Sequence, residues 1–176
     1  MGLFSKLFSK QEKKSEEPKE EGIYIDDEYC RFGYFANPNS NEYGYEGNIL
    51  PEDSYSDLDE LTVYLDTDGP ETTEAGKCYT RFKELFADMD RVDFEVKKTV
   101  ADFFLLKPEY TDGKSTQQLI DGMQISWMGF FRNGDTQFSI DNAGVYASDI
   151  DLFIKADGSK EIQYEDYDHG IHKDKC

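Results

Sequence analysis

Hydrophobic and polar residues alternate in the first part of the chain, which is typical of β-strands. Two aromatic-rich segments, 29–35 (YCRFGYF) and 43–49 (YGYEGNI), are separated by the turn-forming stretch ANPNSNE. Residues 61–65 (LTVYL) place Leu61, Val63 and Leu65 on one face and Thr62 and Tyr64 on the other. This pattern predicts three strands, with the acidic stretch PEDSYSDLDE looping outward between the last two.

The middle of the chain changes to a helical period. Apolar residues from Ala75 to Met89 recur at spacings of three and one, which predicts a core-facing helix, and a second stripe runs from Val92 to Phe104. Pro108 is expected to end this second helix. Ser115, with Gln118 three residues later, forms a capping-box pattern for a short third helix.

Alternation returns in the last third of the chain. Met123, Ile125, Trp127, Gly129 and Phe131 recur at every second position, and Asn133-Gly134 then supplies a hairpin turn. Further strands are predicted around residues 138–140, 150–154 and 162–164, with a turn at Asp157-Gly158. The order of strands, helices and strands predicts an α+β fold, with an antiparallel sheet of about six to seven strands and two or three helices packed on one face.

The chain is predicted to have one domain, residues 23–168, between a segment of residues 1–22 and a C-terminal tail of residues 169–176. Residues 11–22 are charged and have no apolar side chain that could pack, which predicts a solvated linker. Residues 1–10 form an amphipathic helical stripe with flanking lysines, which is a candidate anchor to a membrane surface or a partner through Leu3, Phe4, Leu7 and Phe8. The alternative is a frayed terminus or a cover over the domain's own apolar surface.

Composition adds a strong acidic bias. The chain has 176 residues and a net charge of −19, which excludes duplex nucleic acid as a partner of its main surface. Residues 26–68 hold twelve acidic residues and one basic residue, whereas residues 71–114 hold ten and eight. Residues 135–168 again hold nine and two. The strands and their loops therefore carry nearly all the excess charge. Such a field would favour a cationic partner, and the alternative is that the acidic balance only keeps the protein soluble.

Tyrosines interleaved with carboxylates suit recognition of Lys and Arg. The candidate partner-binding residues are Tyr43, Tyr45, Glu46, Asp53, Asp57, Asp59, Glu60, Asp149 and Asp151. The pair His169 and His172 near Cys176 has a spacing that could hold a transition metal, but it falls in the predicted tail. We therefore predict no metal, no cofactor and no catalytic residues.

The chain resembles the uncharacterised prokaryotic domain-of-unknown-function family 2262 over roughly residues 29–167. The resemblance rests on FGYF, YGYEGNI, LTVYLDTDG, QISWMGFFRNG followed by DTQFSIDN, and DIDLFIKADGSKEIQYED. Many family members carry a His before the penultimate strand, where this chain has Ala147 and Ser148. The resemblance implies a bacterial cytosolic origin and supports the α+β fold, and it implies no function.

Together these observations predict a non-enzymatic acidic protein of the bacterial cytosol that binds a basic protein partner, such as an immunity-type inhibitor of a cationic toxin. The first alternative is an adaptor at the inner face of the membrane, tethered by residues 1–10. The second is a hydrolase that uses two carboxylates in a tyrosine-lined cleft, which would need one acid with a raised pKa.

Overall fold

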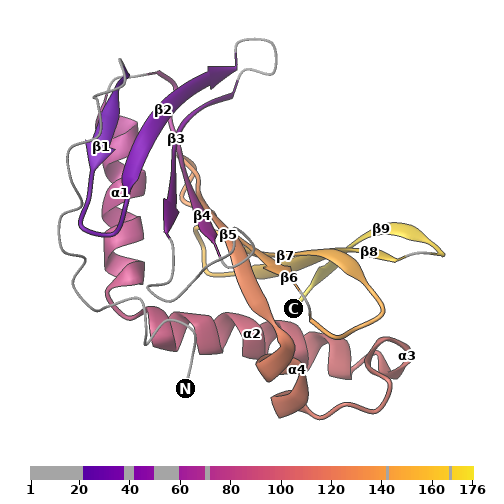
Figure 1. Cartoon of the computed structure of the whole chain (residues 1–176). Helices are drawn as coiled ribbons and strands as arrows, with labels where there is room; N and C mark the ends of the chain where they lie inside the picture. The colour runs from indigo at the N-terminus through magenta and orange to yellow at the C-terminus, as the bar shows by residue number, and fades with distance from the viewer. Residues whose placement is uncertain (1–21, 38–41, 50–59, 70–71, 142, 167) are drawn as a thin grey trace.

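The fold is seen in a computed structural model that describes residues 22–37, 42–49, 60–69, 72–141, 143–166 and 168–176. Within these residues, four helices follow a first set of strands along the chain and precede a second set (Figure 1). The strands before the helices are β1 (Tyr24–Asp26), β2 (Arg31–Asn37), β3 (Glu42–Ile49) and β4 (Leu61–Asp66). The helices are α1 (Thr72–Phe86), α2 (Met89–Leu105), α3 (Pro108–Thr111) and α4 (Thr116–Gly122). The strands after them are β5 (Gln124–Phe130), β6 (Thr136–Asp141), β7 (Ser148–Ile154), β8 (Lys160–Asp166) and β9 (Gly170–Lys175).

All of these strands form one nine-stranded sheet in which spatial order follows chain order from β1 to β9. Neighbouring strands are antiparallel except β4 and β5, which run parallel. Parallel neighbours need a crossover connection, and the segment with the four helices provides it. The carboxyl ends of β4 and β5 therefore meet at the same edge of the sheet.

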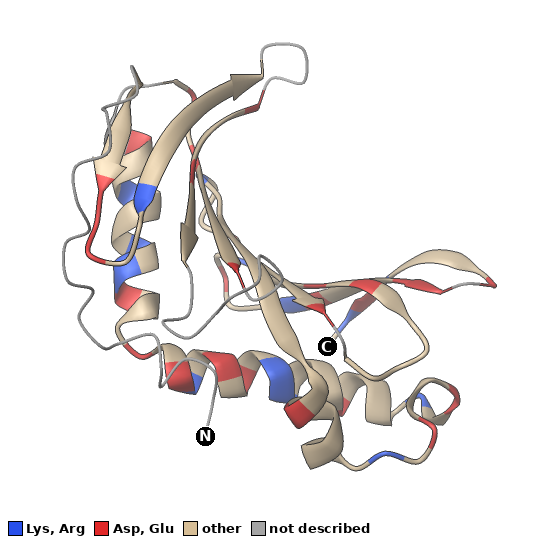
Figure 2. Cartoon of the chain, viewed as in Figure 1, with Lys and Arg blue, Asp and Glu red and all other residues tan. Residues whose placement is uncertain are grey.

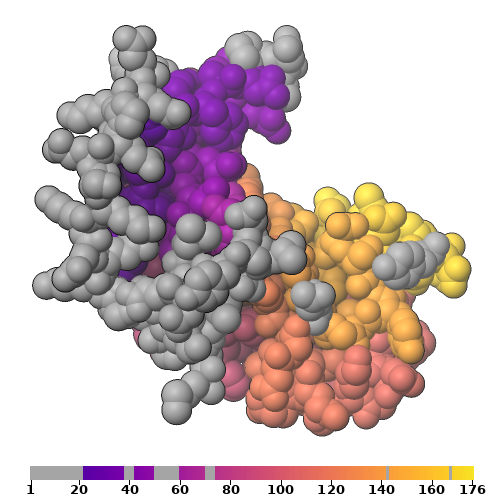
Figure 3. Space-filling view, viewed as in Figure 1, coloured from indigo at the N-terminus to yellow at the C-terminus, as the bar shows by residue number. Residues whose placement is uncertain are grey.

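The helices and one face of the sheet bury each other's apolar side chains. Leu65 and Phe130 from the sheet and Phe82 and Phe104 from the helices are all fully buried in one core. The sheet bends so that the helices lie along its convex side, and its other face is concave (Figure 1). The space-filling view shows the hollow on this side, between the early strands and the last ones (Figure 3). We call the face of the sheet on which none of the described helices packs the bare face.

A polar cluster fixes the β1–β2 turn to helix α1. The Tyr79 hydroxyl donates to Asp27, Lys83 Nζ lies 3.0 Å from the same carboxylate and 2.7 Å from Glu28, and the Tyr29 backbone N–H donates to Asp27 at 3.0 Å. Burial alone would raise the pKa of Asp27, but the hydrogen bonds from Tyr79, Tyr29 and Lys83 together lower it. The cluster therefore holds Asp27 as an anion under the first strands.

Several local predictions are confirmed. The Ser115 side chain accepts from the Gln118 N–H and the Gln118 side chain accepts from the Ser115 N–H, so α4 begins with a complete capping box. Gly134 and Gly158 take positive φ angles of 94° and 84° at the predicted hairpin turns. Helix α2 ends at Leu105, ahead of Pro108.

The sheet is larger than predicted, and one of its pairs is parallel. Strand β1 has three residues, too few to show a period, and β9 (GIHKDK) falls within the segment 169–176 that the sequence predicts to be a tail. In β9 the apolar Ile171 is 67% exposed, so the strand forms through backbone pairing with β8 and not through burial of an apolar face. The predicted helix count is also too low, because Pro108 begins the short helix α3.

Candidate functional site

The predicted site residues fall into three groups. Asp53, Asp57 and Asp59, and the anchor residues Leu3, Phe4, Leu7 and Phe8, lie outside the described residues. Tyr45 is 0% exposed and packs against Tyr34, so the structure places this predicted partner-binding residue in the core and not on the surface. The remaining residues, Tyr43, Glu46, Glu60, Asp149 and Asp151, are half-buried or exposed.

These remaining residues do not form one cluster. Glu46 lies on β3, and Asp149 and Asp151 lie on β7, which is four strands away in the sheet. Four strand spacings amount to about 19 Å. Asp151 accepts a hydrogen bond of 2.6 Å from Ser139, and Asp149 has a φ of 47° where the β7–β8 register shifts. What Glu46 and Asp151 share is their position on the bare face.

The same face carries a group of aromatic side chains, from β2, β4, β5 and the residue after β5, that the sequence patterns do not single out. Phe35, Tyr64, Trp127 and Phe131 form a continuous strip, which we call the aromatic strip. Tyr64 stacks on Trp127 with ring centroids 5.9 Å apart and an interplanar angle of 20°. Phe35 and Phe131 lie 5.9 and 6.0 Å from Tyr64. All four rings are half-buried, so they remain in part accessible from the concave side.

Two glycines, which have no side chain, make room for the rings of this strip. A Cβ atom on Gly129 would lie 2.3 Å from the Trp127 ring, and one on Gly44 would lie 2.2 Å from the Tyr64 ring. Contacts this short do not occur in folded proteins, so any larger residue at either position would displace a ring. Glycine at these two positions therefore lets the rings of the aromatic strip lie close to the sheet backbone.

One part of this strip could have been found from sequence. The alternation in β4 places Tyr64 on the face opposite Leu61, Val63 and Leu65, and the structure confirms that arrangement. The sequence pattern groups Trp127 with Ile125, but the β5–β6 register shifts between these residues. This bulge moves Trp127 to the bare face while Ile125 stays in the core.

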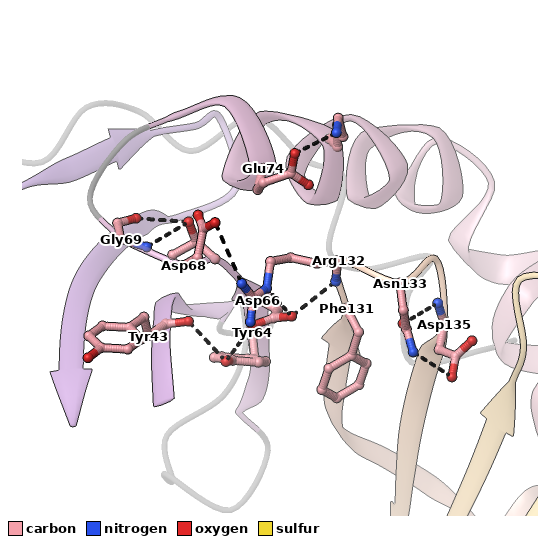
Figure 4. A network of polar contacts seen from close by, with 12 residues as sticks. Tyr43, Tyr64, Asp66, Asp68, Gly69, Glu74, Phe131, Arg132, Asn133 and Asp135 are labelled. Atoms are coloured by element: carbon pink, nitrogen blue, oxygen red, sulfur yellow. Dashed lines mark hydrogen bonds and ion pairs between the residues drawn. The ribbon is translucent and has the colours of Figure 1, made fainter. Parts of the chain in front are cut away.

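A charged network holds the end of the strip at the edge where β4 and β5 finish (Figure 4). Asp66 accepts from both the backbone N–H and the Nε of Arg132, each at 3.0 Å. Arg132 Nη1 also lies 3.8 Å from Asp68, and its hydrogen bond with Asp66 raises the pKa of Arg132. The Tyr64 hydroxyl donates to the Tyr43 carbonyl at 3.2 Å. These contacts tie β3, β4 and the β5–β6 turn together.

The Tyr64 hydroxyl is strongly shifted from its ordinary titration range. Burial, followed by the negative charges of Asp66 and Glu42, raises the pKa of Tyr64 to about 12. The hydroxyl therefore stays protonated at neutral pH and serves as a hydrogen-bond donor. Its role here is to orient the ring at the centre of the aromatic strip.

One row of paired residues crosses the bare face from acid to acid. Strand register aligns Glu46 with Tyr64, Tyr64 with Gly129, Gly129 with Gln137, Gln137 with Phe153, and Phe153 with Glu161. We call this the cross-sheet row, and it spans about 24 Å along the sheet. Its two glutamates stand on either side of the aromatic centre.

Carboxylates dominate the rest of this face as well. Within β3 to β8, the alternation that buries the core residues points these acids to the bare face: Glu42, Glu46, Asp66, Asp141, Asp151, Glu161 and Glu165. In the described residues of β3 to β8, the same alternation places no Lys or Arg side chain on the bare face. Lys173 and Lys175 belong to β9, the edge strand that pairs with β8. Helices α1 and α2, by contrast, carry both signs (Figure 2), and Arg91–Glu95 is an ion pair within a helix.

In the part of the chain that the structure describes, neither buried aspartate faces a second carboxylate, and no metal-ligand cluster is formed. The carboxylates of Asp27 and Asp93 are 2% and 9% exposed, and each contacts a lysine, Lys83 and Lys97 respectively, instead of a second carboxylate. No three His, Cys, Asp or Glu side chains of these residues converge as metal ligands do. None of the described helices is both long and apolar enough to cross a membrane.

No protein-family model, curated protein or solved structure matches the chain. The resemblance to family 2262 therefore stays a prediction from the sequence. The bare face, with its aromatic strip and its carboxylates, is the surface from which a function can be inferred.

Proposed function

We propose that this protein is a non-enzymatic binding protein whose bare face receives a basic region of a protein partner. One observation carries the proposal: carboxylates lie beside an accessible aromatic strip on the bare face, with no Lys or Arg from the strands β3 to β8 among them. An inhibitor of the immunity type, which covers the cationic surface of a toxin, is the specific form of this role that we propose.

The physical basis is electrostatic complementarity. Like charges gathered on one concave face give that face a negative potential, which steers a cationic partner towards it and speeds association. The cations on the helices are largely compensated by neighbouring acids, as in the pairs Lys98–Asp102 and Arg91–Glu95. The convex side therefore offers much weaker attraction to the same partner.

A binding assay with a matched control tests this proposal. The probe is a fluorescently labelled peptide of alternating Lys and Ser, and its anisotropy is followed at low and at high salt. The bare-face variant is E46Q/E161Q/E165Q, and the control variant D90N/E109Q/D112N changes the net charge equally on exposed helix and loop positions. Three exposed charge contacts at about 0.2–1 kcal/mol each predict roughly tenfold weaker binding to the bare-face variant.

The control variant is expected to bind within about twofold of the wild type, and salt is expected to weaken binding to both. Equal weakening in the two variants would show that net charge, and not this face, attracts the peptide. That result, or the absence of binding to the wild type at low salt, would refute the proposal.

A further inference from the structure

The aromatic strip has a composition that charge attraction alone does not require. A cationic partner could be attracted by carboxylates on any surface, yet here the centre of the acidic face is made of Phe35, Tyr64, Trp127 and Phe131. We propose that this strip receives arginine side chains of the partner, which stack on its rings while the flanking carboxylates bind their N–H groups. This inference rests on the proposed function and names the chemistry that the partner must present.

The spacing of groups around Tyr64 suits a guanidinium. Glu46 is directly opposite Tyr64 in the β3–β4 register, and such neighbours have Cβ atoms about 4.5–5.5 Å apart. Asp66 follows two residues later on the same strand and face, but it already binds Arg132, so Glu46 is the acid that this spacing offers to a partner. A group stacked on the Tyr64–Trp127 pair is therefore within reach of the carboxylate of Glu46.

Arginine fits this arrangement better than lysine does. Its planar guanidinium stacks on aromatic faces, is weakly hydrated, and offers a fork of N–H donors to a carboxylate. An ammonium group holds its water more tightly and presents no flat face. A strip of rings bordered by carboxylates thus favours arginine, whereas the carboxylates by themselves would accept either residue.

The protein's own cations do not take this place within the described residues. Arg31 lies over Tyr24 at 5.1 Å, and Lys155 lies over Phe153 at 5.0 Å, so other rings of the molecule do carry an internal cation. Arg132 is the cation nearest in sequence to the strip, and it is held by Asp66 and Asp68 at the strand ends. The described cation–π pairs leave the rings of the strip to a partner.

The chain supplies its own reporter for the test. Trp127 is the only tryptophan in the sequence and belongs to the strip, so intrinsic emission reports contact at this position alone. The experiment titrates the wild-type protein with two peptides of equal charge, one of alternating Arg and Ser and one of alternating Lys and Ser. We expect the arginine peptide to bind about tenfold more tightly and to change Trp127 emission, and the lysine peptide to bind without that change.

Two variants link the preference to the rings. F35L/F131L shortens the strip and keeps Trp127, and F94L/Y146L removes two rings that are 49% and 61% exposed elsewhere on the surface. The preference for arginine should fall to about twofold in F35L/F131L and stay unchanged in F94L/Y146L. Thermal unfolding of each variant checks its fold. If a variant does not fold, the comparison of the two peptides on the wild-type protein still tests the preference for arginine.

The outcomes separate this inference from the proposed function. If both peptides bind equally, depend on the acids of the bare face and leave Trp127 emission unchanged, the acidic face binds cations and the arginine inference fails. If neither peptide binds, both proposals fail. If a neutral oligosaccharide changes Trp127 emission and the arginine peptide does not, the strip is a sugar platform and the arginine inference is overturned.

Discussion

Replacing Gly129 with alanine tests whether the backbone under the aromatic strip holds the indole of Trp127 in place. The added Cβ would lie 2.3 Å from one corner of that ring, whereas ordinary contacts begin at 3.4 Å, so the ring has to move by about 1.1 Å. Tyr64 stacks on the same ring at 5.9 Å, and Phe131 lies 6.5 Å from it. The movement therefore disturbs the whole strip.

The cost follows from overpacking. A methyl group forced into a packed site costs about 1–3 kcal/mol of the free energy of unfolding, and a chain of this size loses roughly 2–4 °C of Tm per kcal/mol. A Cβ added at Gly76, which lies inside α1, would meet no other atom within 4 Å. Gly76→Ala makes the same chemical change and should stabilise the protein by about 0.5–1 kcal/mol through helix propensity.

Urea unfolding followed by far-UV circular dichroism measures both variants, because that signal does not depend on the tryptophan. The Gly129→Ala protein should unfold at lower urea than the wild type, show altered Trp127 emission and bind the arginine peptide more weakly. Wild-type stability together with wild-type emission in this variant would refute the close approach of ring and backbone. A loss of stability in Gly76→Ala would show that the helix assignment there is wrong.

Three further changes address the fold. Ser115→Ala removes the N-cap of α4 and should cost about 1 kcal/mol in urea unfolding, and an unchanged midpoint would contradict the capping box. The Tyr110 hydroxyl donates to Asp166 and lowers the pKa of that acid to about 2, below the unfolded value of about 3.9. Its contribution is therefore complete above about pH 4 and is lost as the pH falls towards 2, so Asp166→Asn should flatten this part of a stability–pH profile. Lys83→Met leaves the carboxylate of Asp27, 2% exposed, without its cation, which should cost about 1–3 kcal/mol at neutral pH; equal stability of variant and wild type would show that the pair contributes nothing.

Local patterns in the sequence identify much of the fold. The β4 alternation, the helical stripes and the two hairpin turns each depend on neighbours within a few residues, and the structure confirms them. The same reasoning fails at the bulge after Ile125, because one extra residue in a strand reverses the face of every residue that follows it. The alternation therefore assigns Trp127, at the centre of the candidate site, to the wrong face.

Burial is the second point that local patterns could not decide. Tyr45 and Tyr64 are both tyrosines in strands rich in acids, yet Tyr45 is 0% exposed and Tyr64 lies half-buried on the bare face. The interleaved pattern of tyrosines and acids does not separate them. Which face of β3 the helices cover depends on packing with α1, which brings together residues far apart in the chain.

The sequence by itself determined the succession of a strand region, a helical region and a second strand region, the turns, and the concentration of negative charge in the strand-forming parts of the chain. Only the tertiary structure decided that β4 and β5 pair in parallel, that β9 joins the edge, and that four aromatic rings meet on one face of the sheet beside Glu46. The physical reason is that helical and strand periods arise from neighbouring residues, whereas strand partners and shared faces depend on contacts between distant segments.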